Sequence, residues 1–395
     1  MTSRPSVRPA PVSYSQWVRQ VLARMEPQRD RLVSLFESSV PEPLELLAEL
    51  VSDSFGGAVT RHYESAFASG NPHVIETLAR EYAVAKEQVL STTGATGALS
   101  LLYRALLRPG DRLLVENPGF DLFGILARSY GLGVDTFERS GPRFAIDPET
   151  VERAIGPDTR LIVISNLHNP SGFMVSEDVL RALGEIADRH EVYLVVDEVY
   201  APYAGDAAKP AVTLGISPRI ISINSLTKIY GLSTLRCGWI VADAKVMEPV
   251  RALNREVEFA ISKLSHAIAA RILEDPDAYR ERTAAIVSGA RPFIDAYHAR
   301  WLAEGLVEGE LPEHGCIAFP RLVGIEDTGT FSEWLAEERG VIVAPGEYFG
   351  APGHVRLGFG IDAARLELGL EVMTEAMHSY RDARTRAGET RMKQR

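Results

Sequence analysis

Four short polar segments of the chain carry the residue types that could perform chemistry. Between them they contain a lysine, an aspartate, two tyrosines, an arginine and several hydroxyl side chains, and three of the segments directly follow a short apolar run. A lysine amine can attack a carbonyl carbon, and a glycine-containing turn before a helix can bind an anion. The segments are Ser165-Asn-Leu-His-Asn-Pro-Ser-Gly172, Asp197-Glu-Val-Tyr200, Asn224-Ser-Leu-Thr-Lys-Ile-Tyr-Gly231 with Arg236 beyond it, and Thr92-Thr-Gly-Ala-Thr-Gly97.

Lys228 is the residue of this set most able to act as a nucleophile. The chain holds only six lysines, and this one follows an apolar run and lies beside Ile229, Tyr230 and Leu232. Partial burial lowers the pKa of an amine and makes it nucleophilic, which is the usual route to a Schiff base. A lysine considered alone is most often a surface residue, so this hypothesis depends on its neighbours.

The other groups also have ordinary structural explanations when each is taken alone. A carboxylate at a strand end, such as Asp197, commonly caps a helix or forms a salt bridge. Arg236 could be a solvated charge or a fork for a phosphate. The Asn-Pro-Ser-Gly sequence at 169–172 is a common turn, and the segment 92–97 could simply start a helix. Their joint occurrence, in this order, indicates one site.

A buried parallel sheet would bring these segments together. Short β-branched and aliphatic runs recur in the middle of the chain, and amphipathic stretches such as Ser176 to His190 separate several of them. This alternation indicates a largely parallel sheet covered by helices on both faces. Ligands of such sheets bind beyond the carboxyl ends of the strands. The strand candidates are Leu113 to Val115, Leu161 to Ile164, Tyr193 to Val196, Ile220 to Ile223 and Trp239 to Val241.

The flanking sequence predicts further parts with different character. Helical apolar spacing appears around Trp17 to Leu22 and Leu44 to Leu50, and an α+β pattern with three strand candidates and a final helix follows residue 290. Those candidates are Cys316 to Phe319, Gly340 to Ala344, His354 to Phe359 and the helix Ala363 to Tyr380. We therefore expect a flexible tail at 1–13, an arm contributing to a small domain at 14–50, a large domain at 51–290, a small domain at 291–385 and a polar tail at 386–395.

Composition excludes several classes of function. The 395 residues are 46% hydrophobic and carry a net charge of −11, which argues against a nucleic-acid or anionic membrane surface. Two cysteines, Cys237 and Cys316, cannot form a disulfide framework and suit a reducing compartment. No apolar run reaches membrane-spanning length, and the N-terminus lacks the apolar core of a signal peptide. We expect a cytoplasmic protein without a metal site.

The order and spacing of the polar segments closely resemble the fold-type I pyridoxal-phosphate enzymes, specifically the class I and II aminotransferases. That family's motifs are Asn-Pro-x-Gly, Asp-x-x-Tyr and Ser-x-(Ser/Thr)-Lys-x-(aromatic)-Gly-Leu followed by an arginine. Here they stand at 169–172, 197–200 and 225–232 with Arg236, and the later motifs at 345–350 and 356–359 also match. The resemblance runs from about Leu35 to Met377. It implies an α/β fold with a mostly parallel seven-stranded sheet between helices, and a smaller α+β domain built from the C-terminal and N-terminal segments.

The resemblance also implies a role for each matched residue toward pyridoxal 5′-phosphate. Lys228 would hold the cofactor as a Schiff base and move a proton at the substrate Cα, and Asp197 would pair with the pyridine nitrogen. Tyr200 and Asn169 would hydrogen-bond the ring oxygen. The remaining matched residues would bind the phosphate through Ala95, Thr96, Ser225 and Arg236, stack on the ring through Phe120, and bind the substrate carboxylate through Arg356 with Asn169.

Tyr63 matches a tyrosine that reaches the phosphate of the neighbouring subunit in this family, which implies a homodimer with its site at the interface. The glycine that usually helps cover the substrate carboxylate is replaced by Glu37-Ser-Ser-Val-Pro41, so the resemblance does not specify the substrate.

The resulting functional prediction is an aminotransferase that moves an amino group from an L-amino acid to a 2-oxo acid. The same residues would also serve a specialised pyridoxal-phosphate enzyme, such as a C–S or β-lyase, or a cyclase or oxidase of the capreomycidine-synthase kind acting on a guanidino amino acid. Two other classes fit less well. A transcription regulator would need a DNA-binding domain before the fold, where only about 35 residues stand. A nicotinamide dehydrogenase would need a G-x-G-x-x-G sequence after its first strand, and none is present.

Overall fold

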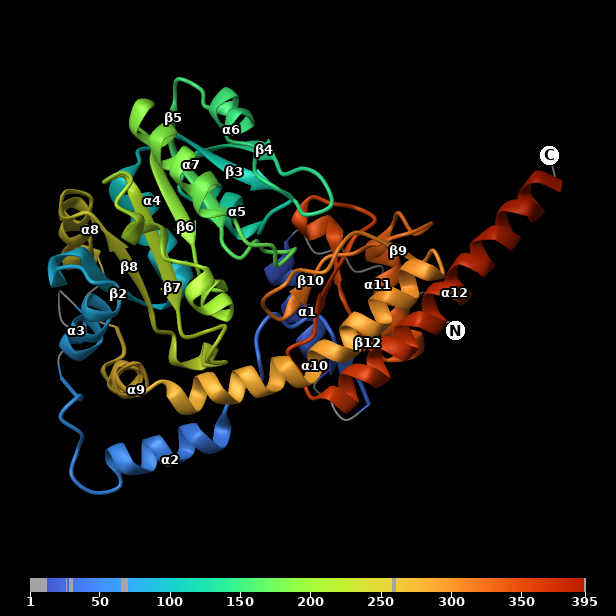
Figure 1. Ribbon diagram of the computed structural model, residues 1–395, viewed down its shortest axis with the longest axis horizontal. Helices are drawn as coiled ribbons and strands as arrows, with labels where there is room; N and C mark the ends of the chain where they lie inside the picture. The colour runs from blue at the N-terminus through green and yellow to red at the C-terminus, as the bar shows by residue number, and fades with distance from the viewer. Residues whose placement is uncertain (1–12, 26, 28–30, 65–69, 258–260, 394–395) are drawn as a thin grey trace, which may run out of the picture.

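Seven strands form one sheet in the order β2-β8-β7-β6-β5-β3-β4 (Figure 1). All neighbouring strands run parallel except β8, which is antiparallel to both β2 and β7. The computed structural model describes residues 13–25, 27, 31–64, 70–257 and 261–393, so almost all of the tail expected at 1–13 lies outside it. The strands are β2 (Val89–Thr92), β3 (Arg112–Asn117), β4 (Gly133–Glu138), β5 (Thr159–Ser165), β6 (Tyr193–Asp197), β7 (Ile220–Ser225) and β8 (Gly238–Ala242).

Helices cover both faces of this sheet because its strands are apolar on both sides. Successive residues of β3, such as Leu113 and Leu114, point to opposite faces of the sheet and belong to different buried clusters. One face packs on α4 (Gly94–Leu106), α5 (Leu122–Ser129) and α8 (Ala244–Val257). The other packs on α3 (Pro72–Glu81), α6 (Pro148–Ala154), α7 (Glu177–Arg189) and α9 (Lys263–Glu274). The predicted α/β sheet between helices is confirmed, with the seven strands that the resemblance implied.

Two of the seven strands, β2 and β4, lack the apolar run by which the other strands are predicted from the sequence. β2 has only two apolar residues before Ser91 and Thr92, and β4 is the half-exposed edge strand with the mixed sequence Gly-Val-Asp-Thr-Phe-Glu. Their pairing partners, rather than their own hydrophobicity, place them in the sheet. The five strands between them, β3, β5, β6, β7 and β8, each contain one of the apolar runs that predict a strand.

Three small sheets and several helices build the remaining part of the molecule (Figure 1). The strand pairs are β1 (Val33–Ser34) with β12 (Val341–Ile342) and β9 (Val307–Glu308) with β11 (Arg321–Leu322), and the triplet is β10 (Ile317–Ala318), β14 (Val355–Gly358) and β13 (Ala344–Pro345). The helices are α1 (Tyr14–Met25), α2 (Leu44–Phe55), α10 (Asp277–Ala303), α11 (Thr328–Arg339) and α12 (Ala363–Lys393). The 27-residue α10 runs from beside the large sheet to the small ones, and α12 projects beyond them (Figure 1).

The final helix is longer than the sequence predicts. It was expected to end near Tyr380, but α12 continues to Lys393 and so includes most of the segment expected to be a polar tail. That segment holds three arginines and one each of Ala, Glu, Met, Lys and Gln, which are good helix formers but give no apolar period. Hydrophobic spacing alone therefore missed its helicity. Among the described residues, no helix is both long enough and apolar enough to cross a membrane.

The antiparallel strand β8 fixes the position of the α4 N-terminus. A Cβ placed on Gly238, the first residue of β8, would lie 2.4 Å from the carbonyl carbon of Gly94 and 2.8 Å from the amide nitrogen of Ala95. Both atoms belong to the backbone of the first turn of α4, so they cannot rotate away. The chain therefore needs glycine at position 238 for this close approach.

We expect Gly238→Ala to lower the free energy of unfolding by about 1–3 kcal/mol, because the added methyl group forces the strand and helix apart. Urea unfolding followed by circular dichroism measures the change. Gly289→Ala is the matched control: a Cβ placed on Gly289, inside α10, would meet no described atom within 4 Å, so this change should stabilise the protein by about 0.5–1 kcal/mol. Equal stability of Gly238→Ala and the unmodified protein would contradict this packing argument.

Candidate active site

The three polar segments that follow apolar runs lie at the same edge of the sheet. Ser165 at the end of β5 pairs with Asp197 at the end of β6, and Asp197 pairs with Ile223 near the end of β7. The loops that carry Asn169 and Lys228 therefore leave the same edge of the sheet, one on each side of the loop that follows Asp197, as parallel strands require. The fourth segment adds the start of α4, which Gly238 holds against β8.

Lys228 lies in the turn that follows β7, and hydrogen bonds hold both its side-chain amine and its backbone carbonyl. Its Nζ donates a 3.0 Å hydrogen bond to Ser38 Oγ and lies 5.3 Å from the centre of the Tyr200 ring. Its backbone carbonyl accepts a 2.9 Å hydrogen bond from the Tyr203 hydroxyl. The amine is half-buried and points toward the loop of Tyr200, where a carbonyl compound could reach it.

Asp197 is a buried carboxyl group with little to stabilise its charge. Burial raises its pKa to about 7, although a backbone hydrogen bond from Val199 and the charge of Lys228 oppose this rise. Val199 N lies 3.3 Å from Asp197 Oδ1, and Asp197 forms no ion pair with any described residue. A ligand with a cationic nitrogen next to Asp197 would restore the charged form.

Tyr200 and Asn169 offer two hydrogen-bond donors near Lys228. The Tyr200 hydroxyl is buried and has no hydrogen-bond partner among the described residues. Asn169 Oδ1 accepts a 2.8 Å hydrogen bond from Arg356 Nη1, which leaves the amide NH2 group to donate elsewhere. Ser165 fixes the Asn169 backbone by accepting its N–H at 3.0 Å. Both donors could bind one oxygen atom of a ligand.

Arg236 and the start of α4 form a positively polarised cradle. No side chain caps the N-terminus of α4, so the backbone N–H groups of its first turn, including those of Ala95 and Thr96, remain available to an anion. Arg236 has φ +48° and places Nη2 3.3 Å from the carbonyl oxygen of Thr93. A Cβ on Gly94 would lie 2.6 Å from that nitrogen, so glycine makes room for the guanidinium. Ser225 is buried at the end of β7 in the strand pair that leads to Gly238.

Arg356 is a completely buried guanidinium on β14. Besides Asn169, it donates to the Tyr14 hydroxyl and, at 3.1 Å, to the carbonyl oxygen of Phe36. Its Nε is buried without a hydrogen-bond partner, and it forms no ion pair within the described part of the chain. The rings of Tyr14 and Phe349 lie 4.8 and 4.9 Å from its central carbon. A buried arginine without a carboxylate is well suited to bind one.

Phe120 lies beside the residues described above, whereas Tyr63 makes its contacts elsewhere. Phe120 contacts the ring of Tyr14, with a centroid distance of 6.2 Å, so it lies on the side of the site where α1 closes it. Tyr63 is 40% exposed and instead contacts Phe55 and Lys263, whose Nζ lies 4.2 Å from its ring centre. The described contacts of Tyr63 therefore do not include Lys228 or Arg236 of its own chain.

Ser38 and Tyr203 contact Lys228, and Tyr14 contacts Arg356, although none of the three belongs to a motif described above. Ser38 and Lys228 are 190 residues apart, and Tyr14 and Arg356 are 342 apart, so no local pattern links them. The one usable signal was the segment Glu37-Ser-Ser-Val-Pro41, which departs from the family pattern at the place where the substrate carboxylate is covered.

The donor set fits pyridoxal phosphate. A half-buried amine, an unpaired buried carboxyl, an orphan tyrosine hydroxyl and an uncapped helix start with an arginine beside it correspond to the aldehyde, ring nitrogen, ring oxygen and phosphate of this cofactor. The buried guanidinium of Arg356 matches the carboxylate of an amino acid. This agreement rests on the observed partners and unused hydrogen-bonding capacity of these side chains.

Comparisons with known proteins agree with this chemistry. Residues 66–373 match the family described as aminotransferase class I and II. A probable aspartate/prephenate aminotransferase of Thermus aquaticus is 30% identical over 330 residues, covering 78% of this chain and 82% of that protein. The capreomycidine synthase of Streptomyces vinaceus is 29% identical over 305 residues, covering 75% and 76%.

A solved structure of a Thermus thermophilus aspartate aminotransferase mutant superposes with a TM-score of 0.81 and 25% identity, covering 95% of this chain and 99% of that one. The likeness extends through the large sheet and the smaller sheets alike. The sequence resemblance is thereby confirmed: this chain belongs to the class I and II aminotransferase family, and its fold is that of the fold-type I enzymes.

Proposed function

We propose that this aminotransferase carries pyridoxal 5′-phosphate on Lys228 and transfers an amino group from an L-amino acid to a 2-oxo acid. The observation that carries the assignment of the site is the buried Asp197 carboxyl, whose raised pKa calls for a cationic partner near the Lys228 amine. When bound, the cofactor supplies an electron sink that stabilises negative charge at the substrate Cα. Its family is known to use this cofactor.

Lys228 has two tasks in this proposal. Its Nζ attaches the cofactor through the aldehyde carbon and, once the substrate amine has displaced it, accepts and returns the proton at the substrate Cα. Ser38 Oγ, 3.0 Å from Nζ, holds the free amine and limits the directions in which it can move. Tyr203 fixes the Lys228 backbone, so that the amine works from a rigid turn.

Asp197, Tyr200 and Asn169 set the charge distribution of the ring. Burial raises the pKa of Asp197, and a protonated ring nitrogen beside it would favour the carboxylate, which in turn would keep that nitrogen protonated. The hydroxyl of Tyr200 and the amide NH2 of Asn169 donate to the ring oxygen. Because Asn169 also accepts from Arg356, it joins the ring to the substrate carboxylate site.

The phosphate and the substrate carboxylate use separate arginines. Arg236, Ser225 and the N–H groups of Ala95 and Thr96 hold the phosphate at the α4 N-terminus, where the helix dipole favours negative charge. Arg356 binds the carboxylate of both the amino donor and the 2-oxo acceptor. Phe120 is proposed to stack on the ring from the side on which Tyr14 lies.

Removing the Tyr14 hydroxyl should weaken substrate binding. In Tyr14→Phe, Arg356 Nη2 loses one partner and the bound carboxylate loses a neighbouring hydroxyl donor. We expect the KM for the amino donor to rise about tenfold with kcat nearly unchanged. Steady-state kinetics with Tyr348→Phe as control tests this, because Tyr348 belongs to the same aromatic cluster but is not among the described hydrogen-bond partners of Arg356. An unchanged KM in Tyr14→Phe would rule out this role.

The exposed apolar side chains of α2 and the loop after it support a homodimer. Leu44, Val51, Val59 and Tyr63 are each at least 40% exposed, although the opposite face of α2 packs on the α3–α9 side of the sheet. Figure 1 places α2 at the lower edge of the molecule, below α9. We propose that a second copy covers this face and that its Tyr63 reaches the phosphate.

Sedimentation velocity tests the dimer. The unmodified protein should sediment as a dimer, and Leu44→Asp should shift it toward monomer because a buried carboxylate at an apolar interface is costly. Leu368→Asp is the control, since Leu368 is similarly exposed but lies on α12. A monomeric unmodified protein, or a fully dimeric Leu44→Asp variant, would disprove this interface.

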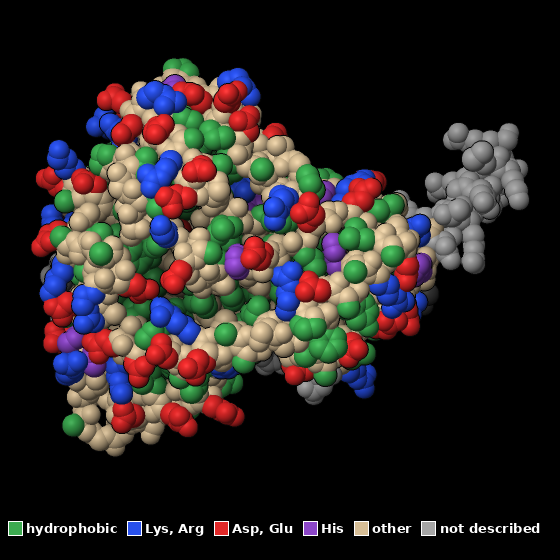
Figure 2. Space-filling model, viewed as in Figure 1, with side chains coloured by type: hydrophobic (Ala, Val, Ile, Leu, Met, Phe, Trp, Pro, Cys, Tyr) green, Lys and Arg blue, Asp and Glu red, His purple; other side chains and the backbone are tan. Residues whose placement is uncertain are grey.

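We also propose that the protein has no nucleic-acid partner and is located in the cytoplasm. Acidic and basic side chains are interspersed over the face shown in Figure 2, so that face offers no continuous basic area for nucleic acid. Both cysteines are free and buried, in keeping with a reducing cytoplasm. The specialised lyase, cyclase or oxidase is not favoured, because the capreomycidine synthase matches no better than the aminotransferases.

The substrate test is a half-reaction with single amino acids. Purified holoenzyme is mixed with each L-amino acid in turn, while the cofactor absorbance and the released 2-oxo acid are measured together. Transamination predicts one 2-oxo acid per cofactor and conversion of the cofactor to its amine form, without free ammonia. Release of ammonia with the cofactor remaining as the aldehyde would instead establish an eliminating enzyme.

A further inference from the structure

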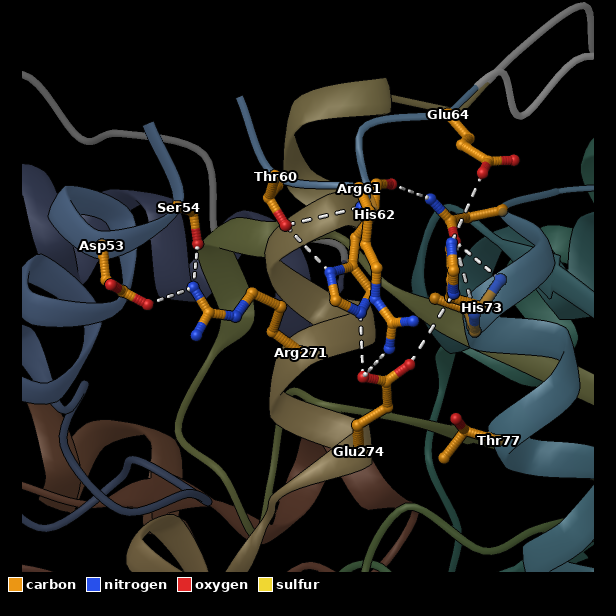
Figure 3. A network of polar contacts seen from close by, with 12 residues as sticks. Asp53, Ser54, Thr60, Arg61, His62, Glu64, His73, Thr77, Arg271 and Glu274 are labelled. Carbon is orange, nitrogen blue, oxygen red and sulfur yellow. Dashed lines mark hydrogen bonds and ion pairs between the residues drawn. The ribbon is translucent and has the colours of Figure 1, made fainter. Parts of the chain in front are cut away.

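A second group of chemically active side chains lies on α3, α9 and the loop between α2 and α3. His62 belongs to that loop, His73 to the first turn of α3, and Glu274 is the last residue of α9 (Figure 3). One nitrogen of each histidine and one oxygen of Glu274 all lie within 4.8 Å of one another. None of the residues proposed to bind cofactor or substrate belongs to this group.

The distances are close to those of a metal centre. His62 Nε2 lies 2.8 Å from Glu274 Oε2, and His73 Nδ1 lies 3.7 Å from Glu274 Oε1. Ligand atoms about 2.0–2.1 Å from a tetrahedral zinc ion are about 3.3 Å apart, a separation that these two values bracket. Two imidazoles and a carboxylate are also a known protein donor set for zinc, with a fourth position left for water.

The outer nitrogens of the two histidines differ in their partners. His62 Nδ1 is hydrogen-bonded to Thr60 Oγ1 at 2.9 Å, whereas His73 Nε2 is buried without a hydrogen bond among the described residues and lies 3.5 Å from Glu64 Oε1. Figure 3 shows both imidazoles and the Glu274 carboxylate turned toward one another. With the proton of each ring on its outer nitrogen, His62 Nε2, His73 Nδ1 and a Glu274 oxygen can act as three ligands to one cation. Orientation of a ligating histidine by a hydroxyl, as Thr60 offers to His62, is typical of metal sites.

The neighbouring arginines leave this position accessible. Arg271 is bound to Asp53 at 2.7 Å and to Ser54 at 2.8 Å, and so points away from Glu274 (Figure 3). Arg61 Nη2 lies 3.7 Å from Glu274 Oε2, but its side chain is 75% exposed and can turn into solvent. Arg61 is therefore the only charged competitor among the described ion pairs that involve Glu274 besides the two histidines.

We propose that His62, His73 and Glu274 bind one divalent transition-metal ion of the zinc type, with Thr60 orienting the His62 imidazole and the Glu64 carboxylate lying near the outer nitrogen of His73. The ion joins the loop at 56–64 to α3 and α9, adding to the 2.8 Å hydrogen bond from Asn71 Nδ2 to the His62 carbonyl. That loop carries Tyr63, so the ion also holds the residue assigned to the partner's phosphate. This last consequence rests on the proposed function, whereas the binding of the ion does not.

The test uses untagged holoenzyme freed of metal with a chelator and titrated with Zn²⁺ in a calorimeter. We expect saturable binding of one Zn²⁺ per chain and a rise in Tm of at least about 2 °C. His73→Gln and Glu274→Gln should each weaken binding at least about tenfold, and Glu64→Gln should weaken it less. His190→Gln is the matched control, because His190 also pairs with a carboxylate, Glu152, at 2.9 Å.

Crystals soaked in Zn²⁺ provide an independent measurement on the unmodified protein. An anomalous difference peak at the zinc edge between His62, His73 and Glu274 would support the proposal even if one variant failed to fold. A peak only elsewhere, binding that His73→Gln and Glu274→Gln leave unchanged, or no stoichiometric binding would overturn it. In the last case, hydrogen bonds and ion pairs alone would account for the contacts of the two histidines with Glu274. Since apoenzyme and holoenzyme should bind the ion alike, loss of cofactor binding would not be mistaken for loss of this site.

Discussion

Lys228→Ala is expected to lower kcat/KM by at least about 10³-fold and to abolish the visible absorbance of the purified enzyme. The variant lacks both the amine that holds the cofactor and the base that moves the proton at the substrate Cα. Its fold should survive, because the Lys228 side chain is half-buried and its backbone contact with Tyr203 does not depend on the side chain. Absorbance spectra and steady-state kinetics on the donor found in the substrate test measure both effects.

The control for this variant is Lys245→Ala, which removes an exposed lysine at the start of α8. It should retain the absorbance and the activity of the unmodified enzyme. Added methylamine should restore part of the lost proton transfer in Lys228→Ala, since a free amine can occupy the space beside Ser38. A Lys228→Ala enzyme that turned over at even a tenth of the normal rate would refute the role of this residue.

Asp197→Asn is expected to lower kcat about a thousandfold while making the cofactor-free protein more stable. An amide cannot keep the ring nitrogen protonated, so negative charge at the substrate Cα loses its electron sink. The same change removes a carboxyl group that burial disfavours in its charged form. Activity and stability should therefore move in opposite directions, which a merely structural carboxylate would not produce.

The stability effect has a defined pH dependence. In the folded apoenzyme the pKa of Asp197 is raised from 3.8 to about 7. Stability contributed by its neutral form is fully present below the unfolded pKa near 4 and is lost as pH rises through the folded pKa near 7. Asp197→Asn should thus match the unmodified apoenzyme at pH 4 and exceed it by up to about 4 kcal/mol at pH 8.

Urea unfolding of both apoenzymes across this pH range measures the difference directly. Comparison of the two proteins cancels the titration of groups that do not interact with Asp197. The buried Glu198 does not cancel, because the Asp197 charge helps to raise its pKa to about 8. Added cofactor should reverse the ranking, because its ring cation stabilises only the carboxylate. A constant difference between pH 4 and pH 8 would mean that Asp197 is not the group whose charge the cofactor compensates.

Residues at the ends of strongly apolar strands were predictable from the sequence. Asp197 and Lys228 follow short β-branched and aliphatic runs that are typical of buried strands, and parallel strands bring their carboxyl ends to one edge. The edge strand β4 and the short β2 were not predictable in this way, because pairing rather than hydrophobicity defines them. The extension of α12 to Lys393 depends on helix propensity, which carries no amphipathic period.

Contacts between distant parts of the chain needed the folded structure. Ser38 reaches Lys228 from an irregular segment, and Tyr14 reaches Arg356 from α1, with no sequence spacing to connect either pair. The group of His62, His73 and Glu274 is the clearest case, since it joins a loop, a helix start and a helix end. From the sequence we expect no metal site, and histidines eleven residues apart give no reason to expect one.

The covalent attachment of the cofactor to Lys228 is the central claim, and borohydride reduction tests it most directly. Reduction of the yellow holoenzyme makes the bond between cofactor and amine permanent, and proteolysis with mass spectrometry then locates it. We predict a phosphopyridoxyl group on the peptide that contains Lys228, at close to one per chain, and on none of the other five lysines. A label on another lysine, or a colourless protein that takes up none, would contradict it.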